Sequence, residues 1–236
     1  MSNGVVALIP ARGGSKGIPR KAVKMLGDIP VIAWTILAAK NSKSIDKVFV
    51  TTEDNEIATV SQKYGAEVLT RPGCLAQNDV QNDEVSLYSL MQLRHERDIF
   101  PDTVVLLQPT SPFRSSEDID NAFELYSGDE TVVSCCVDGR FHWALDEEDE
   151  VISVWHNPMM RMGRQDIDDK DRLMAENGAI YICNSENLAH LRCLRTPPFT
   201  IYLMNELHSV DLDNQSDWDY ATWLVETGRV KRATAS

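Results

Sequence analysis

The sequence contains no C-x-x-C pair and no apolar run near the ~20 residues that a membrane-spanning helix requires. Its five cysteines are odd in number, which is typical of reduced, structural thiols rather than of a disulfide framework. The histidines are scattered without the spacing of metal ligands. Residues 1–4 lack the basic region of a signal peptide, and the apolar run after them ends at Pro10. We therefore expect a cytoplasmic protein without a membrane partner.

Acidic residues are missing from one end of an otherwise acidic chain. The sequence carries 36 Asp and Glu against 23 Lys and Arg, yet no acid precedes Asp28. The net charge of −13 argues against nonspecific nucleic-acid binding, which needs a broad basic surface. The positive charge gathers instead in one short segment, for which a ligand with several negative charges is the expected partner.

That segment is a glycine-rich loop, IPARGGSKGIPRK at 9–21, which follows the apolar run 5–8. Glycines lack a Cβ, so backbone N–H groups can turn inward on an anion. We expect a phosphate-binding loop, whose proposed contacts are Ala11, Arg12, Gly13, Gly14, Ser15, Lys16 and Lys21. A basic, solvated turn is the alternative. The spacing matches neither G-x-x-x-x-G-K-[ST] nor G-x-G-x-x-G, so neither of those nucleotide fingerprints is indicated.

Downstream of the loop, apolar strand patterns alternate with helical ones. We expect strands at 47–52, 67–69, 103–107, 131–137, 178–183 and 200–204, and helices from Pro30 and over 55–64, 83–95, 116–126 and 216–228. Such alternation is typical of an α/β fold with a mainly parallel sheet covered on both faces. With 236 residues and no linker or repeat, we expect a single domain over 1–236. Ligands bind such sheets beyond the carboxyl ends of the strands, where the glycine loop falls.

Residues 138–176 break this pattern. They hold an acidic run at 146–150, which is most simply a solvated turn, between possible hairpin strands at 143–145 and 151–155. Trp155, Met159, Met160 and Met162 cannot all be buried locally. This segment therefore suggests a projecting arm that packs on a partner subunit.

Gln108 follows the clearest apolar strand. Pro109 and Pro112 prevent continuation of that strand, so Gln108 would sit at its carboxyl edge. There its amide can read a base edge or a sugar hydroxyl. The alternative is that Gln108 merely ends the strand.

Asp211 and Asp213 lie on either side of Leu212, shortly before the last helix. If the segment is extended, both carboxylates share one face about 6 to 7 Å apart and can serve one Mg²⁺. The alternative is that Asp213 and Asn214 only cap the helix. Together with the basic loop, the two acids predict a phosphoryl-transfer site.

Four segments together resemble the sugar-acid cytidylyltransferases, the CMP-sialic acid synthetase family. They are the loop at 9–21, LQPTSPFR at 107–114, ENGAIYI at 176–182 and VDLD at 210–213, in the order and at about the spacing of that family. The resemblance implies a Rossmann-like nucleotidyltransferase fold. It also implies a homodimer in which 138–176 is a dimerisation arm that reaches over the neighbouring active site.

The resemblance further implies an activity and its site. CMP would pass from CTP to the anomeric hydroxyl of a nonulosonic, sialic-type acid, with release of pyrophosphate, for surface glycan biosynthesis. The expected catalytic residues are Arg12, Lys21 and Asp211, and the expected Mg²⁺ ligands are Asp211 and Asp213. Beyond the loop, the nucleotide would contact Arg71 and Gln108. The acceptor would contact Gln108, Arg164, Gln165, Asn177, Gly178 and Tyr181.

Three alanines depart from the family pattern. Ala22 stands where Asn is usual, Ala144 lies near a frequent Lys, and Ala175 stands where some members carry Arg. Fewer cations on the acceptor side leave room for legionaminic, pseudaminic or deaminated acids. Two alternatives stay open: a cytidylyltransferase for another acid such as KDO or a phosphonate, and a catalytically degenerate homologue that binds nucleotide or sugar.

Overall fold

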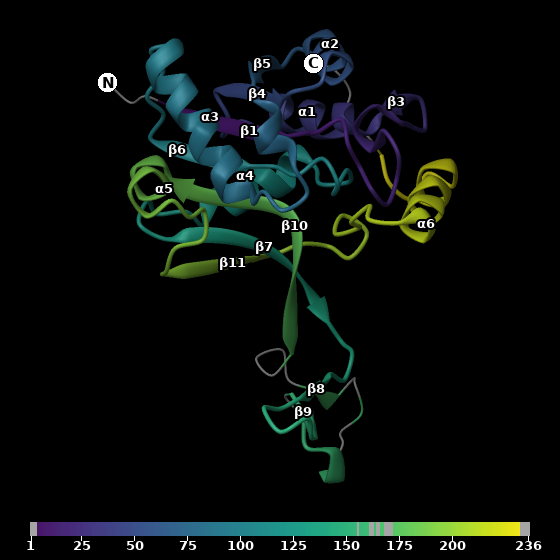
Figure 1. The fold of residues 1–236 in the computed structure, drawn as a ribbon. Helices are drawn as coiled ribbons and strands as arrows, with labels where there is room; N and C mark the ends of the chain where they lie inside the picture. The colour runs from purple at the N-terminus through teal and green to yellow at the C-terminus, as the bar shows by residue number, and fades with distance from the viewer. Residues whose placement is uncertain (1–3, 155, 161–162, 164–165, 168–171, 232–236) are drawn as a thin grey trace.

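The structure is a computed structural model that describes residues 4–154, 156–160, 163, 166–167 and 172–231. A seven-stranded sheet in the order β11-β7-β10-β6-β1-β4-β5 forms its centre (Figure 1). These strands are β1 (Val5–Pro10), β4 (Lys47–Thr52), β5 (Glu67–Thr70), β6 (Thr103–Leu106), β7 (Thr131–Asp138), β10 (Leu173–Asn184) and β11 (Phe199–Leu203). Only β10 runs antiparallel to its neighbours, β6 and β7. The predicted α/β fold with a mainly parallel sheet is confirmed.

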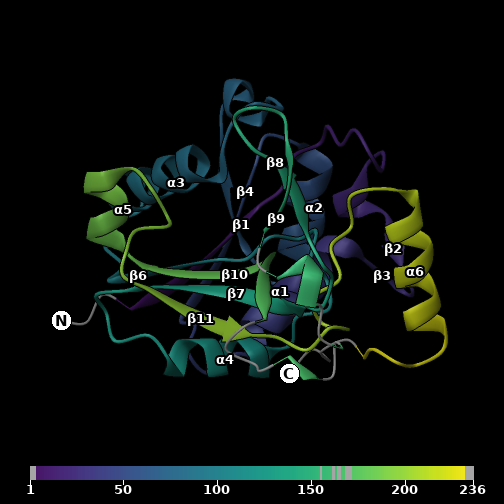
Figure 2. The same ribbon diagram turned by 90° about the horizontal axis from the view of Figure 1, so that it is seen from below.

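Helices cover both faces of the sheet. They are α1 (Val31–Asn41), α2 (Asn55–Lys63), α3 (Asn82–Glu96), α4 (Ser116–Glu124), α5 (Ser185–Leu191) and α6 (Gln215–Glu226), with short 3₁₀ turns η1 (Lys21–Val23), η2 (Gly73–Ala76) and η3 (Pro158–Met160). Apolar residues of α1, α2 and α4 pack on one face, and those of α3 and α5 pack on the other. Figure 2 shows α3 and α5 on the side of the sheet opposite to α4.

The continuous apolar strands follow from this layering. In β1, Ala7 and Ile9 belong to one core, whereas Val6 and Leu8 belong to the core on the other face. A strand that is buried on both faces needs apolar side chains at successive positions, because alternate residues point to opposite faces. The apolar run of β1 is therefore typical of a strand with neighbours on both sides and helices on both faces. The glycine-rich loop begins where β1 ends.

A third core joins α6 to the rest of the fold. Trp218 and Leu224 of α6 pack with Trp34 and Leu37 of α1, and the indole Nε1 of Trp34 donates to the carbonyl of Leu26, 3.1 Å away. Leu26 belongs to the small hairpin of β2 (Met25–Leu26) and β3 (Ile29–Pro30), which the sequence did not predict. This packing fixes the segment that leads into α6, which carries Asp211 and Asp213.

The predicted arm projects from the sheet (Figure 1). The end of β7 pairs with the beginning of β10, and the hairpin of β8 (Trp143–Leu145) and β9 (Val151–Ser153) lies beyond them. Met159 and Met160 are 90% and 76% exposed, as expected for side chains without local burial. Trp155 and Met162 lie outside the described residues. Within the described ranges, no helix has both the length and the apolar character to cross a bilayer.

Candidate active site

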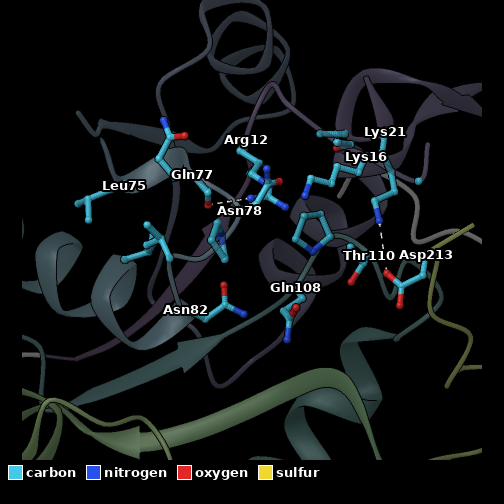
Figure 3. A pocket seen from close by; sticks show the side chains of 18 of the residues that line it. Arg12, Lys16, Lys21, Leu75, Gln77, Asn78, Asn82, Gln108, Thr110 and Asp213 are labelled. Atoms are coloured by element: carbon cyan, nitrogen blue, oxygen red, sulfur yellow. Dashed lines mark hydrogen bonds and ion pairs between the residues drawn. The ribbon is translucent and has the colours of Figure 1, made fainter. Parts of the chain in front are cut away.

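A cavity of about 390 Å³ opens beyond the carboxyl ends of β1, β5 and β6 (Figure 3). The structure brings most of the predicted nucleotide-binding residues to it: Ala11, Arg12, Ser15, Lys16, Lys21, Arg71 and Gln108. Asp213 lines the same cavity from the segment before α6. Gly13 and Gly14 belong to the loop but lie outside this lining.

The basic residues of the loop enter the cavity from one side. Figure 3 shows Arg12, Lys16 and Lys21 around it, with Gln108 and Thr110 across from them. Arg12 Nη1 donates to the carbonyl of Gln77, 2.8 Å away, which joins the loop to the segment before α3. Three cations around one cavity make it suited to a polyanion.

Lys21 connects the loop to the acidic segment. Its Nζ donates to the carbonyl of Leu212 and lies 3.8 Å from Asp213 Oδ1. Burial lowers the pKa of Lys21, although the nearby carboxylates of Asp213 and Asp211 oppose that shift. The amine is therefore partly removed from water and close to both acids.

Leu212 anchors the segment that carries Asp211 and Asp213. Leu212 between them is fully buried, and its N–H donates to the carbonyl of Thr110, 2.8 Å away. Asn214, not Asp213, caps α6, because the Asn214 side chain accepts from the N–H groups of Ser216 and Asp217. Capping therefore does not use the Asp213 carboxylate.

The carboxyl of Asp211 is in an unusual environment. Burial raises its pKa and the charge of Asp213 raises it further, whereas a hydrogen bond with Thr110 and the charge of Lys21 act in the opposite direction. Its Oδ1 is buried and has no hydrogen-bond partner. An acid with a raised pKa and an unpartnered oxygen, beside a second acid and a polyanion cavity, fits a hard cation such as Mg²⁺. The part of the chain described by the structure contains no cluster of three His, Cys, Asp or Glu that could hold a metal ion, so substrate oxygens and water would complete the shell.

Gln108 stands between the main cavity and a smaller hollow of about 50 Å³, whose wall includes Tyr181 and Arg195. Gly178 has a φ of +68°, and a Cβ added there would lie 3.3 Å from Gln108 Nε2. The Tyr181 hydroxyl donates to Glu176 Oε2, 3.0 Å away, and burial raises the pKa of Tyr181. Gln108, Gly178 and Tyr181, all predicted to bind the acceptor, therefore lie close together.

The other predicted acceptor residues are placed differently. The amide of Asn177 is buried, where its Oδ1 accepts from Ser134 Oγ at 2.6 Å and its Nδ2 donates to Ser209 Oγ at 2.9 Å. Its side chain thus joins β7 and β10 to the segment before Asp211. Arg164 and Gln165 lie outside the described residues.

Two groups of residues escaped the sequence reasoning. The segment before α3 lines the main cavity with Leu75, Gln77, Asn78 and Val80, and Asn82 at the start of α3 joins them, although this segment lacks periodicity and glycines. Arg114 is fully buried, and its Nε and Nη1 donate to the carbonyl of Ala179 at 2.8 Å and to Thr35 Oγ1 at 2.9 Å. Its Nη2 donates to the carbonyl of Gln108. Arg114 lies in the LQPTSPFR motif, and this was the signal in the sequence that could have drawn attention to it.

Comparisons with known proteins identify the family. The profile of the cytidylyltransferase family, described as "Cytidylyltransferase", matches residues 6–227. The N-acylneuraminate cytidylyltransferase of Escherichia coli O18:K1:H7 is 33% identical over 233 residues, which are 96% of this chain and 53% of that protein. The CMP-N,N'-diacetyllegionaminic acid synthase of Legionella pneumophila is 30% identical over 227 residues, 94% of this chain and 96% of that protein. The chain thus spans about half the length of the first relative and nearly all of the second.

Solved structures agree in fold. A CMP:2-keto-3-deoxy-manno-octonic acid synthetase complexed with CTP superposes with a TM-score of 0.67 at 14% identity, over 95% of this chain and 99% of that one. The 4-diphosphocytidyl-2C-methyl-D-erythritol synthase of Anaerococcus prevotii gives a TM-score of 0.69 at 12% identity, over 94% of this chain and 96% of that one. The chain therefore belongs to the cytidylyltransferase family, and its predicted membership of the CMP-sialic acid synthetase family is confirmed.

Proposed function

We propose that the protein transfers CMP from CTP to the anomeric hydroxyl of a nonulosonic acid and releases pyrophosphate. One observation carries the proposal: the basic loop and Asp213 line one cavity, where Lys21 contacts the acidic segment that also carries Asp211. Nucleotidyl transfer needs a site that binds a polyanion and, beside it, a pair of acids that binds a metal ion. Names of the relatives that are 30% or more identical support CTP and a nonulosonic acid as substrates.

In the proposed reaction, Arg12, Lys16 and Lys21 hold the triphosphate through charge. The oxygen of the acceptor hydroxyl attacks the α-phosphorus in line and its proton passes to solvent. The bond between the α-phosphorus and the oxygen that bridges to the β-phosphate breaks, and pyrophosphate leaves while the loop neutralises its charge. Asp211 and Asp213 would hold Mg²⁺, which when bound neutralises charge between nucleotide and acceptor. Gln108, Gly178 and Tyr181 would position the acceptor beside the nucleotide.

The arm and its partners belong to the same proposal. We infer a homodimer in which the arm of one subunit covers the site of the other, with Arg164 and Gln165 reaching the acceptor. The exposed apolar side chains of the arm support this. An Arg facing the acceptor carboxylate would contribute roughly 1.5 to 3 kcal/mol. The cytoplasm remains the proposed location.

Two alternatives compete with this reading. A cytidylyltransferase for KDO is supported by the fold shared with the manno-octonic acid synthetase. A degenerate binding homologue is opposed by Asp211, because pure binding does not need a desolvated acid with an unpartnered oxygen.

The test is pyrophosphate release with Mg²⁺, each of the four nucleoside triphosphates, and a panel of nonulosonic acids, KDO and simple phosphonates. The proposal expects release with CTP and a nonulosonic acid. Release with KDO or a phosphonate alone would favour the first alternative. Binding of CTP by calorimetry without release across the panel would favour the second, and absence of CTP binding would contradict both the proposal and the first alternative.

A further inference from the structure

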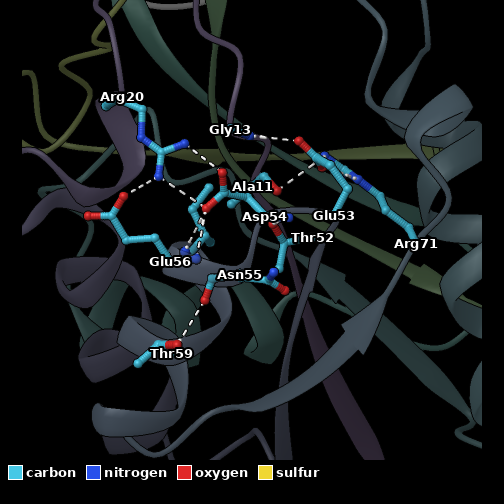
Figure 4. Close-up of polar contacts among 11 residues, drawn as sticks. Ala11, Gly13, Arg20, Thr52, Glu53, Asp54, Asn55, Glu56, Thr59 and Arg71 are labelled. Atoms are coloured by element: carbon cyan, nitrogen blue, oxygen red, sulfur yellow. Dashed lines mark hydrogen bonds and ion pairs between the residues drawn. The ribbon is translucent and has the colours of Figure 1, made fainter.

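An acidic turn underlies the basic loop. Glu53 and Asp54 follow β4, the strand beside β1, and no expected function includes either of them (Figure 4). Glu53 Oε1 accepts the backbone N–H of Gly13 at 2.7 Å, and Glu53 Oε2 lies 3.2 Å from Arg71 Nε. Arg71 Nη2 in turn donates to the carbonyl of Ala11 at 3.1 Å. Glu53 and Arg71 thus hold the loop on both sides of Arg12.

Asp54 forms an ion pair with Arg20, near the C-terminal end of the same loop. Its Oδ2 lies 2.5 Å from Arg20 Nη1, and its Oδ1 accepts the N–H groups of Glu56 and Ile57, both at 3.0 Å, at the start of α2. A Cβ added at Gly13 would lie 2.5 Å from Asp54 Oδ2. The loop therefore passes against the turn at a distance that only glycine permits at this position.

The hydrogen bond between Glu53 and the Gly13 N–H determines which backbone N–H groups of the loop are free to bind a ligand. The N–H of Gly13 already donates to a carboxylate, so an anion can use it only if Glu53 moves. Movement of Glu53 would leave the Arg71 side chain, which is 3% exposed, without its carboxylate partner. The Glu53 side chain is 22% exposed, so the pair is half-buried, and removing the partner of the buried guanidinium is unfavourable. Gly14, in contrast, is exposed, and a Cβ added there would meet nothing within 4 Å.

We propose that Glu53 is a positioning residue that shapes the phosphate loop through Gly13 and Arg71 and stays in place when the nucleotide binds. The anion then contacts the loop beyond Gly13. This inference rests on the proposed function, because it takes CTP as the ligand. The opposite role is a placeholder: a carboxylate that occupies the anion position and is displaced by the triphosphate.

The two roles predict opposite effects of Glu53→Ala on CTP affinity. A positioning residue predicts that the Kd and KM for CTP with Mg²⁺ rise at least ~10-fold, the loss expected for a charge-assisted hydrogen bond, while kcat at saturating CTP changes less. The Kd and KM of Glu53→Gln should lie between those of the wild type and of Glu53→Ala, because its amide oxygen can still accept from the Gly13 N–H. Glu67→Gln is the matched control, since Glu67 is exposed at the start of β5, away from the cavity.

Hydrogen exchange of the Gly13 amide provides a readout that does not depend on turnover. The proposal expects slow exchange in the wild type and in Glu67→Gln, and fast exchange in Glu53→Ala. Tighter CTP binding by Glu53→Ala, or unchanged Gly13 exchange in both Glu53 variants, would overturn it. If Glu53→Ala fails to fold, the CTP affinity of Glu53→Gln decides: weaker binding than in Glu67→Gln supports the proposal, and tighter binding overturns it.

Failure of the proposed function would be recognised separately, because wild-type protein would then release no pyrophosphate. If wild-type protein also bound no CTP, the loop would need another probe. In that case inorganic tripolyphosphate serves as the probe of the loop. Weaker tripolyphosphate binding by Glu53→Ala than by the wild type supports the positioning role of Glu53. Tighter tripolyphosphate binding by Glu53→Ala contradicts it.

Discussion

Gly17 lies where the phosphate loop crosses the acidic segment. A Cβ added at Gly17 would be 1.8 Å from the carbonyl oxygen of Asp213, so one of the two backbones must move. We predict that Gly17→Ala lowers the free energy of unfolding by about 1 to 3 kcal/mol, the usual cost of overpacking, and also reduces pyrophosphate release. Urea unfolding and the release assay measure the two effects.

Gly139→Ala is the control for this prediction, because a Cβ added at Gly139 meets nothing within 4 Å. Its unfolding midpoint should stay close to that of the wild type. Equal stability of Gly17→Ala and Gly139→Ala would mean that the loop and the acidic segment are not held at the distance described.

At the residue scale, charge and glycine content predicted which side chains reach the cavity. Arg12, Lys16 and Lys21 enter it because a basic loop that follows a buried strand can extend only beyond the sheet edge. The direction of the Asn177 amide was not predictable, since its partners Ser134 and Ser209 are 43 and 32 residues away in the chain. Glu53 was missed because an acid after a strand resembles an ordinary turn.

At the element scale, the start of α4 is tied to the segment that leads to Asp211. Asp118 completes the capping box of α4 with Ser115, and it also accepts from His208 Nδ1 at 2.7 Å and Tyr202 Oη at 3.1 Å. Burial opposes ionisation of Asp118, but its hydrogen bonds from His208 and Ser115 outweigh burial and lower the pKa to about 2. The hydrogen bond with Asp118 raises the pKa of His208.

This pair predicts a pH dependence. Because the pKa of His208 is higher in the folded than in the unfolded protein, its stabilisation is complete below about pH 6.5 and is lost as pH rises through the folded pKa. The loss should be about 1 kcal/mol, a charge-assisted hydrogen bond discounted for the partial exposure of His208. Urea unfolding at pH 6 and pH 9 measures it. His208→Gln should remove this part of the pH dependence, and an unchanged slope in that variant would contradict the assignment.

Element boundaries were predictable where burial is complete and not where it is partial. The strand at 47–52 appears as expected, and the helix predicted over 55–64 is observed over Asn55–Lys63, because apolar residues and the Asp54 cap mark these elements. β10 begins at Leu173, five residues earlier than expected at Gly178, since its first half runs into the arm and alternates exposed and half-buried side chains. Its antiparallel direction follows from the return of the chain through the arm, which no local pattern encodes.

At the scale of the whole molecule, the arm exposes apolar side chains that a monomer would leave in water. Leu145 and Val151 face each other across the β8–β9 hairpin and are 63% and 65% exposed. Large exposed apolar patches mark interaction sites. We predict that the protein sediments as a dimer, and that Leu145→Glu with Val151→Glu shifts it toward the monomer without changing its circular dichroism.

Analytical ultracentrifugation at micromolar concentration measures this equilibrium. Replacement of the exposed Glu148 in the hairpin turn by Gln serves as the control, because it leaves the apolar side chains in place. A monomeric wild type, or a double variant that dimerises as well as the wild type, would contradict the prediction.

The most direct test of the account is pyrophosphate release from CTP and a nonulosonic acid by wild-type protein and by Asp211→Asn. We predict turnover by the wild type and a rate at least ~100-fold lower in the variant, with CTP binding retained. Because burial raises the pKa of Asp211, the fold disfavours its charge, and the neutral amide should not lower the unfolding midpoint. Release by Asp211→Asn at the wild-type rate would contradict the assignment of Asp211 and, with it, the proposed chemistry of the site.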